Sequence, residues 1–170
     1  FSEKLSVQMA SILAVSLAFG RFLAGMVAKK ISWVVIVIVC SMVSILILFF
    51  VLPQLKISGE EVKMISSLTE VPFLGFVLPL IGLFIAPIYP LLNSAVLSSL
   101  PKKLHSSMSG LIIIFSALGG TLGSRIVGTL FEVMGGVNAF YFLFIPIILL
   151  IVFVLRIQAI IKKQAKNHTI

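Results

Sequence analysis

Four polar side chains in long apolar stretches could take part in chemistry. Arg125 and Thr121 stand four residues apart in a glycine-rich stretch, so they share one face of a helix. Tyr89 and Asn93 flank Pro90 in another apolar stretch. A guanidinium, two hydroxyls and an amide can hydrogen-bond a polar solute, but they supply neither a nucleophile–base pair nor a set of metal ligands. The pattern therefore predicts binding rather than catalysis, and we expect no enzyme activity, cofactor or metal.

The composition indicates that these stretches lie in a membrane. Of the 170 residues, 60% are hydrophobic and only 11% are charged, whereas soluble domains are about half apolar and about a quarter charged. The net charge of +8 would suggest nucleic-acid binding in a soluble protein. Here most of the positive charge lies in short loops and a tail between apolar runs, which favours a role in membrane orientation. The single Cys40 excludes a disulfide within the chain.

Five apolar runs are long enough to cross a bilayer, which takes about 20 helical residues. The fold class that we predict is an all-α integral membrane protein with five transmembrane helices. Prolines interrupt the third run and predict a kinked or tilted helix there. The expected spans cover residues 7–28, 31–52, 71–97, 106–131 and 139–161, with a polar loop at residues 54–70 and a basic tail at residues 162–170.

The charges of the loops predict the orientation. Lys29, Lys30, Lys102 and Lys103 fall on the same side of a five-span topology as the basic tail, and the five glutamates fall on the other side. Lysine near span ends marks the cytoplasmic side, so we expect the N-terminus outside and the C-terminus inside. The first residues, Phe1-Ser-Glu-Lys, include no initiator methionine and no signal pattern. We therefore expect the chain to begin within a larger protein.

The fourth span has two faces of small residues that repeat every four positions. The first face would let another helix approach closely. The second face includes Thr121 and Arg125, and a small, polar face of this kind is typical of a bundle interior or a water-filled cavity. The members of the first face are Ser116, Gly120, Ser124 and Gly128, and in the first span Ala14, Ala18, Arg21 and Gly25 also share a face.

Three segments carry a resemblance to the major facilitator superfamily of transporters. Residues 18–25 (AFGRFLAG) and residues 88–94 (IYPLLNS) resemble helices eight and ten of its fucose permease-like, sugar:proton symporter branch, and residues 116–128 resemble its glycine-rich eleventh helix. The resemblance implies that the five spans correspond to the last five of twelve helices, with the C-terminus in the cytoplasm. It also implies proton-coupling carboxylates in an N-terminal half, whereas no expected span here contains Asp or Glu. An arginine at position 125 departs from the pattern of this branch.

Each candidate residue has more than one interpretation. Arg125 lies about 9 Å from the outer end of its span by helical rise. It could extend to the interface, bind a sugar hydroxyl or an anionic group, or pair with an acid elsewhere. Tyr89 and Asn93 could face a cavity at a proline kink or simply pack there. We expect structural or gating roles for Arg21, Gly20, Gly25, Pro87, Pro90, Gly120, Ser124 and Gly128.

The function that we predict is secondary active transport of a small polar solute, a sugar being one candidate, by alternating access. An ion gradient, with the proton as the expected ion, would drive it, because the chain has no phosphate-binding Gly-Lys-Ser/Thr loop. The expected partners are the solute, the coupling ion, the lipid bilayer and the missing N-terminal half, with no nucleic acid. The alternatives are a structural or assembly membrane protein and a transporter of an organic anion or drug. An intramembrane enzyme and the membrane subunit of an ATP-driven importer fit less well.

Overall fold

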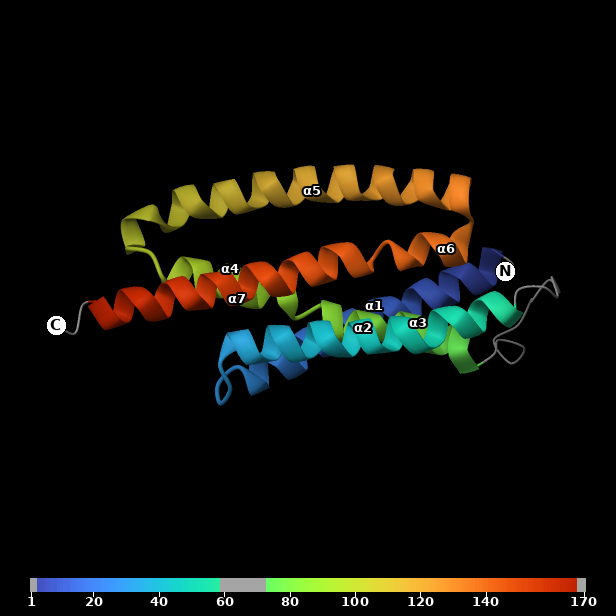
Figure 1. The fold of residues 1–170 in the computed structure, drawn as a ribbon, viewed down its shortest axis with the longest axis horizontal. Coiled ribbons are helices and arrows are strands. Elements are labelled where there is room, and N and C mark those ends of the chain that lie inside the picture. The colour runs from blue at the N-terminus through green and yellow to red at the C-terminus, as the bar shows by residue number, and fades with distance from the viewer. Residues whose placement is uncertain (1–2, 59–72, 168–170) are drawn as a thin grey trace.

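The computed structural model describes residues 3–58 and 73–167, and this part of the chain is helical (Figure 1). The helices run roughly along one long axis. They are α1 (Glu3–Val27), α2 (Trp33–Ser58), α3 (Phe73–Ile85), α4 (Ile88–Ser98), the short 3-10 turn η2 (Lys102–Leu104), α5 (His105–Met134), α6 (Gly136–Tyr141) and α7 (Phe144–Asn167).

Five of the helical stretches in the described part are long and apolar enough to cross a membrane, which confirms the predicted number of spans. They cover Leu5–Val27, Trp33–Gln54, Gly75–Ser98, Lys102–Met134 and Asn138–Ile160. The described part of the chain is therefore all-helical, and its five long apolar helices indicate a multi-pass membrane protein. Much of the predicted loop at residues 54–70 and the last three residues of the predicted tail lie outside the described residues.

Three of the prolines that lie in or beside helices, Pro53, Pro87 and Pro146, have different effects. Helix α2 continues through Pro53 to Ser58, so the expectation that this helix ends at Leu52 is wrong. The third span breaks between Ile85 and Ile88, at Pro87, in agreement with the predicted kink. The fifth span breaks too, because Pro146 has no N–H for the carbonyl of Phe142, which instead accepts from the backbone N–H of Ile145 at 3.2 Å. That second break was not expected.

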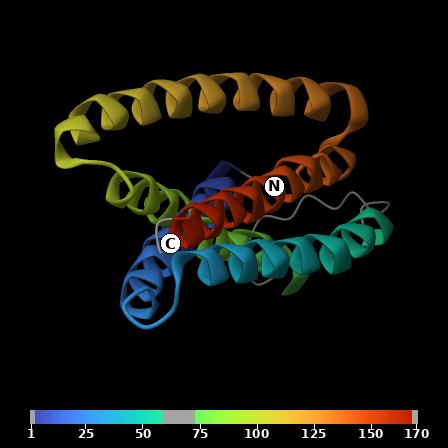
Figure 2. The same cartoon turned by 60° about the vertical axis from the view of Figure 1, so that its left-hand side comes forward.

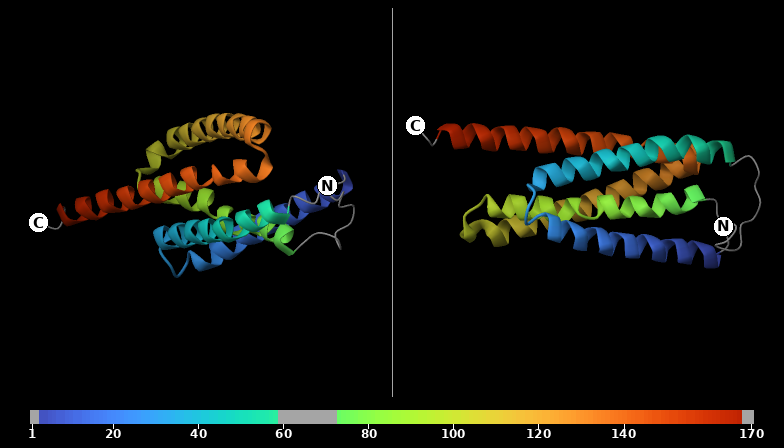
Figure 3. Two further views of the ribbon diagram at one scale, coloured as in Figure 1. Left: turned by 45° about the vertical axis from the view of Figure 1, so that its right-hand side comes forward. Right: turned by 90° about the horizontal axis from the view of Figure 1, so that it is seen from below.

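Helix α2 lies at the centre of the packing. One cluster of buried side chains joins its first half to α7 through Val34, Val37 and Val154, with side chains of α4 packed against it. A second cluster joins its later part to α3 through Leu48, Leu52 and Ile81, with side chains of α6 and α7 around it. The view from below shows α2 between α7 and α3 (Figure 3).

Two glycines let α1 and α3 lie against each other. Gly20 is buried, and a Cβ at this position would collide with the backbone carbonyl of Leu83 in α3. Gly82 gives the reciprocal contact, because a Cβ there would lie 2.7 Å from a methyl carbon of Leu13. Glycine at both positions removes the side chains that would hold the helices apart. Gly25, one turn and one residue beyond Gly20, has open space around it.

The contrast between these two glycines gives a matched pair of substitutions. We expect Gly20→Ala to lower the free energy of unfolding by about 1–3 kcal/mol, because the backbone of α3 must shift to make room. Gly25→Ala should leave it unchanged or raise it by up to about 1 kcal/mol, since alanine is the better helix former. The measurement is unfolding in mixed micelles titrated with a denaturing detergent, followed by circular dichroism. Equal effects of the two substitutions would contradict the close contact at Gly20.

Candidate functional site

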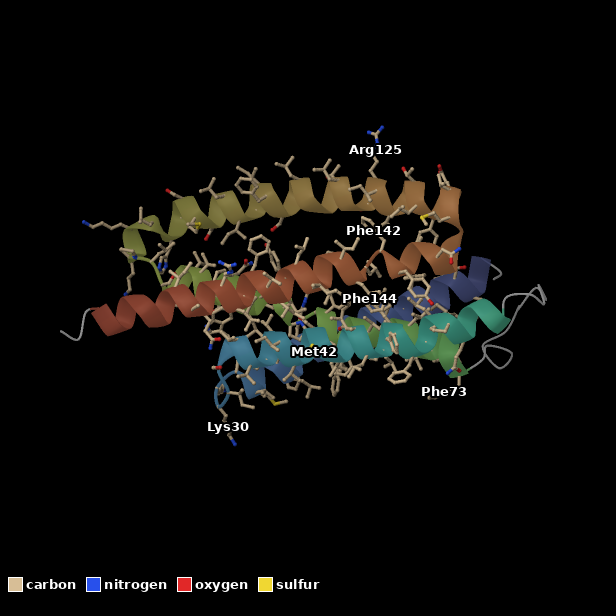
Figure 4. All side chains as sticks on the ribbon, viewed as in Figure 1. Lys30, Met42, Phe73, Arg125, Phe142 and Phe144 are labelled. Carbon is tan, nitrogen blue, oxygen red and sulfur yellow. The ribbon has the colours of Figure 1, made fainter. Side chains whose placement is uncertain are left out.

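Arg125 projects from α5 away from every other helix (Figure 4). Helix α5 stands apart from the bundle along most of its length, and none of its residues is buried (Figure 2). Its half-buried residues Ile112, Gly123, Val127 and Leu130 recur at helical spacing and mark the side turned toward the other helices. Arg125 lies on the opposite side. The described helices therefore give this guanidinium no cavity of their own.

The hydroxyls on the same side as Arg125 are bonded within their helix. Thr121 donates from Oγ1 to the carbonyl oxygen of Ala117 at 2.9 Å, and Thr129 donates to that of Arg125 at 3.0 Å. These bonds occupy the hydroxyl hydrogens but leave the oxygen lone pairs free to accept. On this uncovered surface, the Thr121 hydroxyl oxygen can therefore accept a hydrogen bond from a solute, and the Arg125 guanidinium can donate several.

Tyr89 meets α5 on its inner side, away from Arg125. Ser116 Oγ donates to the Tyr89 hydroxyl oxygen at 3.5 Å, which ties α4 to α5. Asn93 lies one turn further along α4, on the same face as Tyr89. The structure therefore brings Tyr89 and Asn93 together with Ser116, but it separates them from Thr121 and Arg125.

The residues expected to be structural fall into two groups. Gly20 and Pro87 are buried where α1 meets the break between α3 and α4. The others are exposed or have open space where a Cβ would stand: Arg21, Gly25, Pro90, Gly120, Ser124 and Gly128. The small-residue face of α5 accordingly has no helix against its glycines in the described part of the chain.

Sequence reasoning missed Ser41 and Ser44 of α2. Both side chains are fully buried, and both line a cavity of about 330 Å³ beside Tyr89 and the two proline breaks. The available signal was their position, three residues apart and thus on one face of an otherwise apolar span. Serines are common in such spans and usually bond to their own helix, so the signal was weak.

The chemistry that these groups offer is hydrogen bonding and the charge of one guanidinium. Across residues 3–58 and 73–167, His, Cys, Asp and Glu form no group of three that could hold a metal ion. His105, which begins α5, is within 3.0 Å of the carbonyl oxygen of Leu100 through Nε2 and so helps to hold the turn between α4 and α5.

The contact between α4 and α5 can be tested by cross-linking. We expect the pair Tyr89→Cys and Ser116→Cys, in a Cys40→Ser background, to be joined by a short thiol-reactive cross-linker. Trypsin cleaves at Lys102 and Lys103 between them, so the fragments on the two sides of this turn stay joined on a gel only when they are cross-linked. Leu118→Cys in place of Ser116→Cys gives the control, because Leu118 lies on the far side of α5 at a similar depth. Equal cross-linking of both pairs would contradict the observed orientation of α5.

Comparison of the chain with known protein families, with curated proteins and with solved structures found no match. The resemblance to the major facilitator superfamily therefore remains a prediction based on three short segments.

Proposed function

We propose that the chain forms part of a secondary transporter of the major facilitator type, which moves a small polar solute across a membrane by alternating access. A sugar is one candidate for the solute, and a proton gradient is the expected energy source. On this proposal the chain is not an enzyme. The two sides of α5 have different roles on this proposal. Its inner side packs against α4, and its outer side lines the path of the solute.

The observation that carries the proposal is the complete exposure of one polar side of a membrane-length helix. Helix α5 has no buried residue, yet it bears Arg125 and Thr121 on the side turned away from the bundle. A guanidinium in contact with lipid is costly, by about 2.5–3.5 kcal/mol or more at the centre of a span. A water-filled path or a further polar surface against this side would remove that penalty.

The covering surface on this proposal is the N-terminal half of the transporter. Among the described residues, no acid lies within pairing distance of Arg125 along the helices, since Glu132 is two helical turns away near the end of α5 and Glu3 is at the start of α1. A carboxylate on the opposing helices, or an acidic or hydroxylated solute, would complement the guanidinium. The glycines of α5 have open space beside them, which suits the sliding contact that alternating access requires.

The orientation is part of the proposal. The end of α1, the turn between α4 and α5 and the end of α7 lie at one end of the bundle (Figure 1). The lysines at residues 29–30, 102–103 and 162–166 belong to these segments. By the bias of lysine toward the cytoplasm, this end faces inward, in a bacterial inner membrane or a plasma membrane.

Thiol labelling of the natural gene product that carries this sequence tests whether the outer side of α5 lines a path. We expect Thr121→Cys, in a Cys40→Ser background, to react with a membrane-impermeant maleimide in right-side-out and in inverted vesicles. The reason is that alternating access opens the path to each side in turn. Ile126→Cys is the control: it lies about 140° around the helix from Thr121 and about 100° from Arg125, and it should not react.

The same vesicles distinguish transport from assembly. A panel of sugars, organic anions and cationic drugs is added, and the solute that is carried should slow the labelling of Thr121→Cys. If Thr121→Cys reacts from neither side, a partner helix covers α5 permanently, and the structural or assembly function replaces the transporter.

Substitution of the arginines tests direct recognition of the solute. We expect Arg125→Lys to lower uptake about tenfold or more, because an ammonium cannot make the paired hydrogen bonds of a guanidinium. Arg21→Lys is the matched control and should retain uptake, since Arg21 is exposed near the lysine-bearing end of α1. Undiminished uptake by Arg125→Lys would exclude bidentate recognition by Arg125.

A further inference from the structure

A cavity of about 330 Å³ lies where α2 passes both proline-broken spans. Its floor is α2, one wall is the junction of α3 and α4, and the other wall is the start of α7. Tyr89 and Ile85 are exposed and stand at its mouth. The residues that the argument uses are Ser41, Ser44, Ile85, Tyr89, Ile147 and Leu150.

Ser41 has a hydroxyl that no protein group satisfies. Its side chain is completely buried, and its Oγ has no hydrogen-bond partner in the described part of the chain. Buried serines in helices usually donate to the carbonyl oxygen one turn earlier. Ser44 does so, with Oγ donating to the carbonyl of Cys40 at 2.9 Å. Ser41, on the same face of the same helix, does not.

An unpartnered buried hydroxyl is unfavourable, and in a membrane protein no bulk water can compensate for it. The cavity beside Ser41 is the place where a molecule could bind and supply the missing hydrogen-bond partner. Ser44 lines the same cavity one turn further along α2 and its oxygen keeps free lone pairs, so the two buried hydroxyls lie close together just beneath the cavity floor.

Apart from Tyr89, whose hydroxyl accepts from Ser116 of α5, the rest of the lining is apolar. Isoleucine, leucine and proline side chains surround the two serines, and no charged residue takes part. A charged ligand would lose its hydration without an opposite charge in return. Two neighbouring cavities, one smaller at about 250 Å³ and one larger at about 420 Å³, have no hydroxyl-bearing side chain in their lining, so it is its chemistry that distinguishes the first cavity from them.

We propose that this cavity is a binding site for an uncharged amphipathic molecule, with one hydrogen-bonding head on Ser41 and an apolar body against Ile147 and Leu150. The volume suits such a ligand, because an apolar cavity of about 150 Å³ already holds benzene. The mouth at Ile85 and Tyr89 admits the molecule from the surface of the bundle. The site lies on the inner side of α4, apart from Arg125, and it does not depend on the proposed transport function.

Photolabelling of the full chain in lipid nanodiscs tests the site. The probe is 3-azioctanol, an alkanol with a photoreactive diazirine, and adducts are mapped by mass spectrometry. We expect adducts on Ile147, Leu150 or Tyr89 that excess octanol suppresses. Ser41→Ala should reduce them about fivefold, as expected for loss of one hydrogen bond. Ser16→Ala is the control: it removes a buried serine of α1 that does not line the cavity, and labelling should persist.

Two further measurements keep the result unambiguous. Ile147→Trp fills the cavity and should abolish the adducts, while the matching diazirine alkane without a hydroxyl should label weakly and without regard to Ser41. In the absence of probe, Ser41→Ala should not lower the stability of the chain, because it removes an unsatisfied group. Equal labelling by the alkane and the alkanol, or a loss of stability in Ser41→Ala, would overturn the proposal.

Discussion

The contact between Gly20 of α1 and the backbone of Leu83 in α3 is the constraint on which much of the bundle depends. Pro87 has no N–H, so the Leu83 carbonyl loses the donor that a regular helix would supply one turn later. The Cα hydrogen that stands in place of a side chain at Gly20 is directed at this oxygen. Such Cα–H···O contacts recur where helices approach closely. The proline that breaks the third span and the glycine that admits α1 therefore act together.

Helix α5 shows the opposite situation. Its glycines have no neighbours, and its contact with α4 includes the 3.5 Å hydrogen bond between Ser116 and Tyr89. A soluble helix with this much exposed apolar surface would aggregate, whereas lipid can solvate its leucines and isoleucines. Lipid cannot solvate Arg125 equally well. Most of the surface of α5 is therefore compatible with lipid, whereas the side that bears Thr121 and Arg125 is not. That side is where the structure calls for a polar neighbour.

The sequence by itself determined the class of the protein and the number of its spans. Apolar length is a local property, and a run of about 20 uncharged residues must be helical in a bilayer to satisfy its backbone. The break at Pro87 could also be anticipated, since a proline ring removes one hydrogen bond wherever the neighbours lie. The direct bonding of Thr121 and Thr129 to carbonyls four residues earlier is equally local.

Only the tertiary structure decided which residues meet. Four residues with polar side chains looked like one group in the sequence, yet Tyr89 and Asn93 lie on the inner side of α5 and Arg125 on its outer side. Helical periodicity gives the angle between side chains of one helix, but it does not say which side of the helix packs against a neighbouring helix. Pro53 inside α2 and the break before Pro146 depend on packing in the same way. The missing hydrogen-bond partner of Ser41 also depends on packing, because the sequence does not show which groups surround a buried hydroxyl.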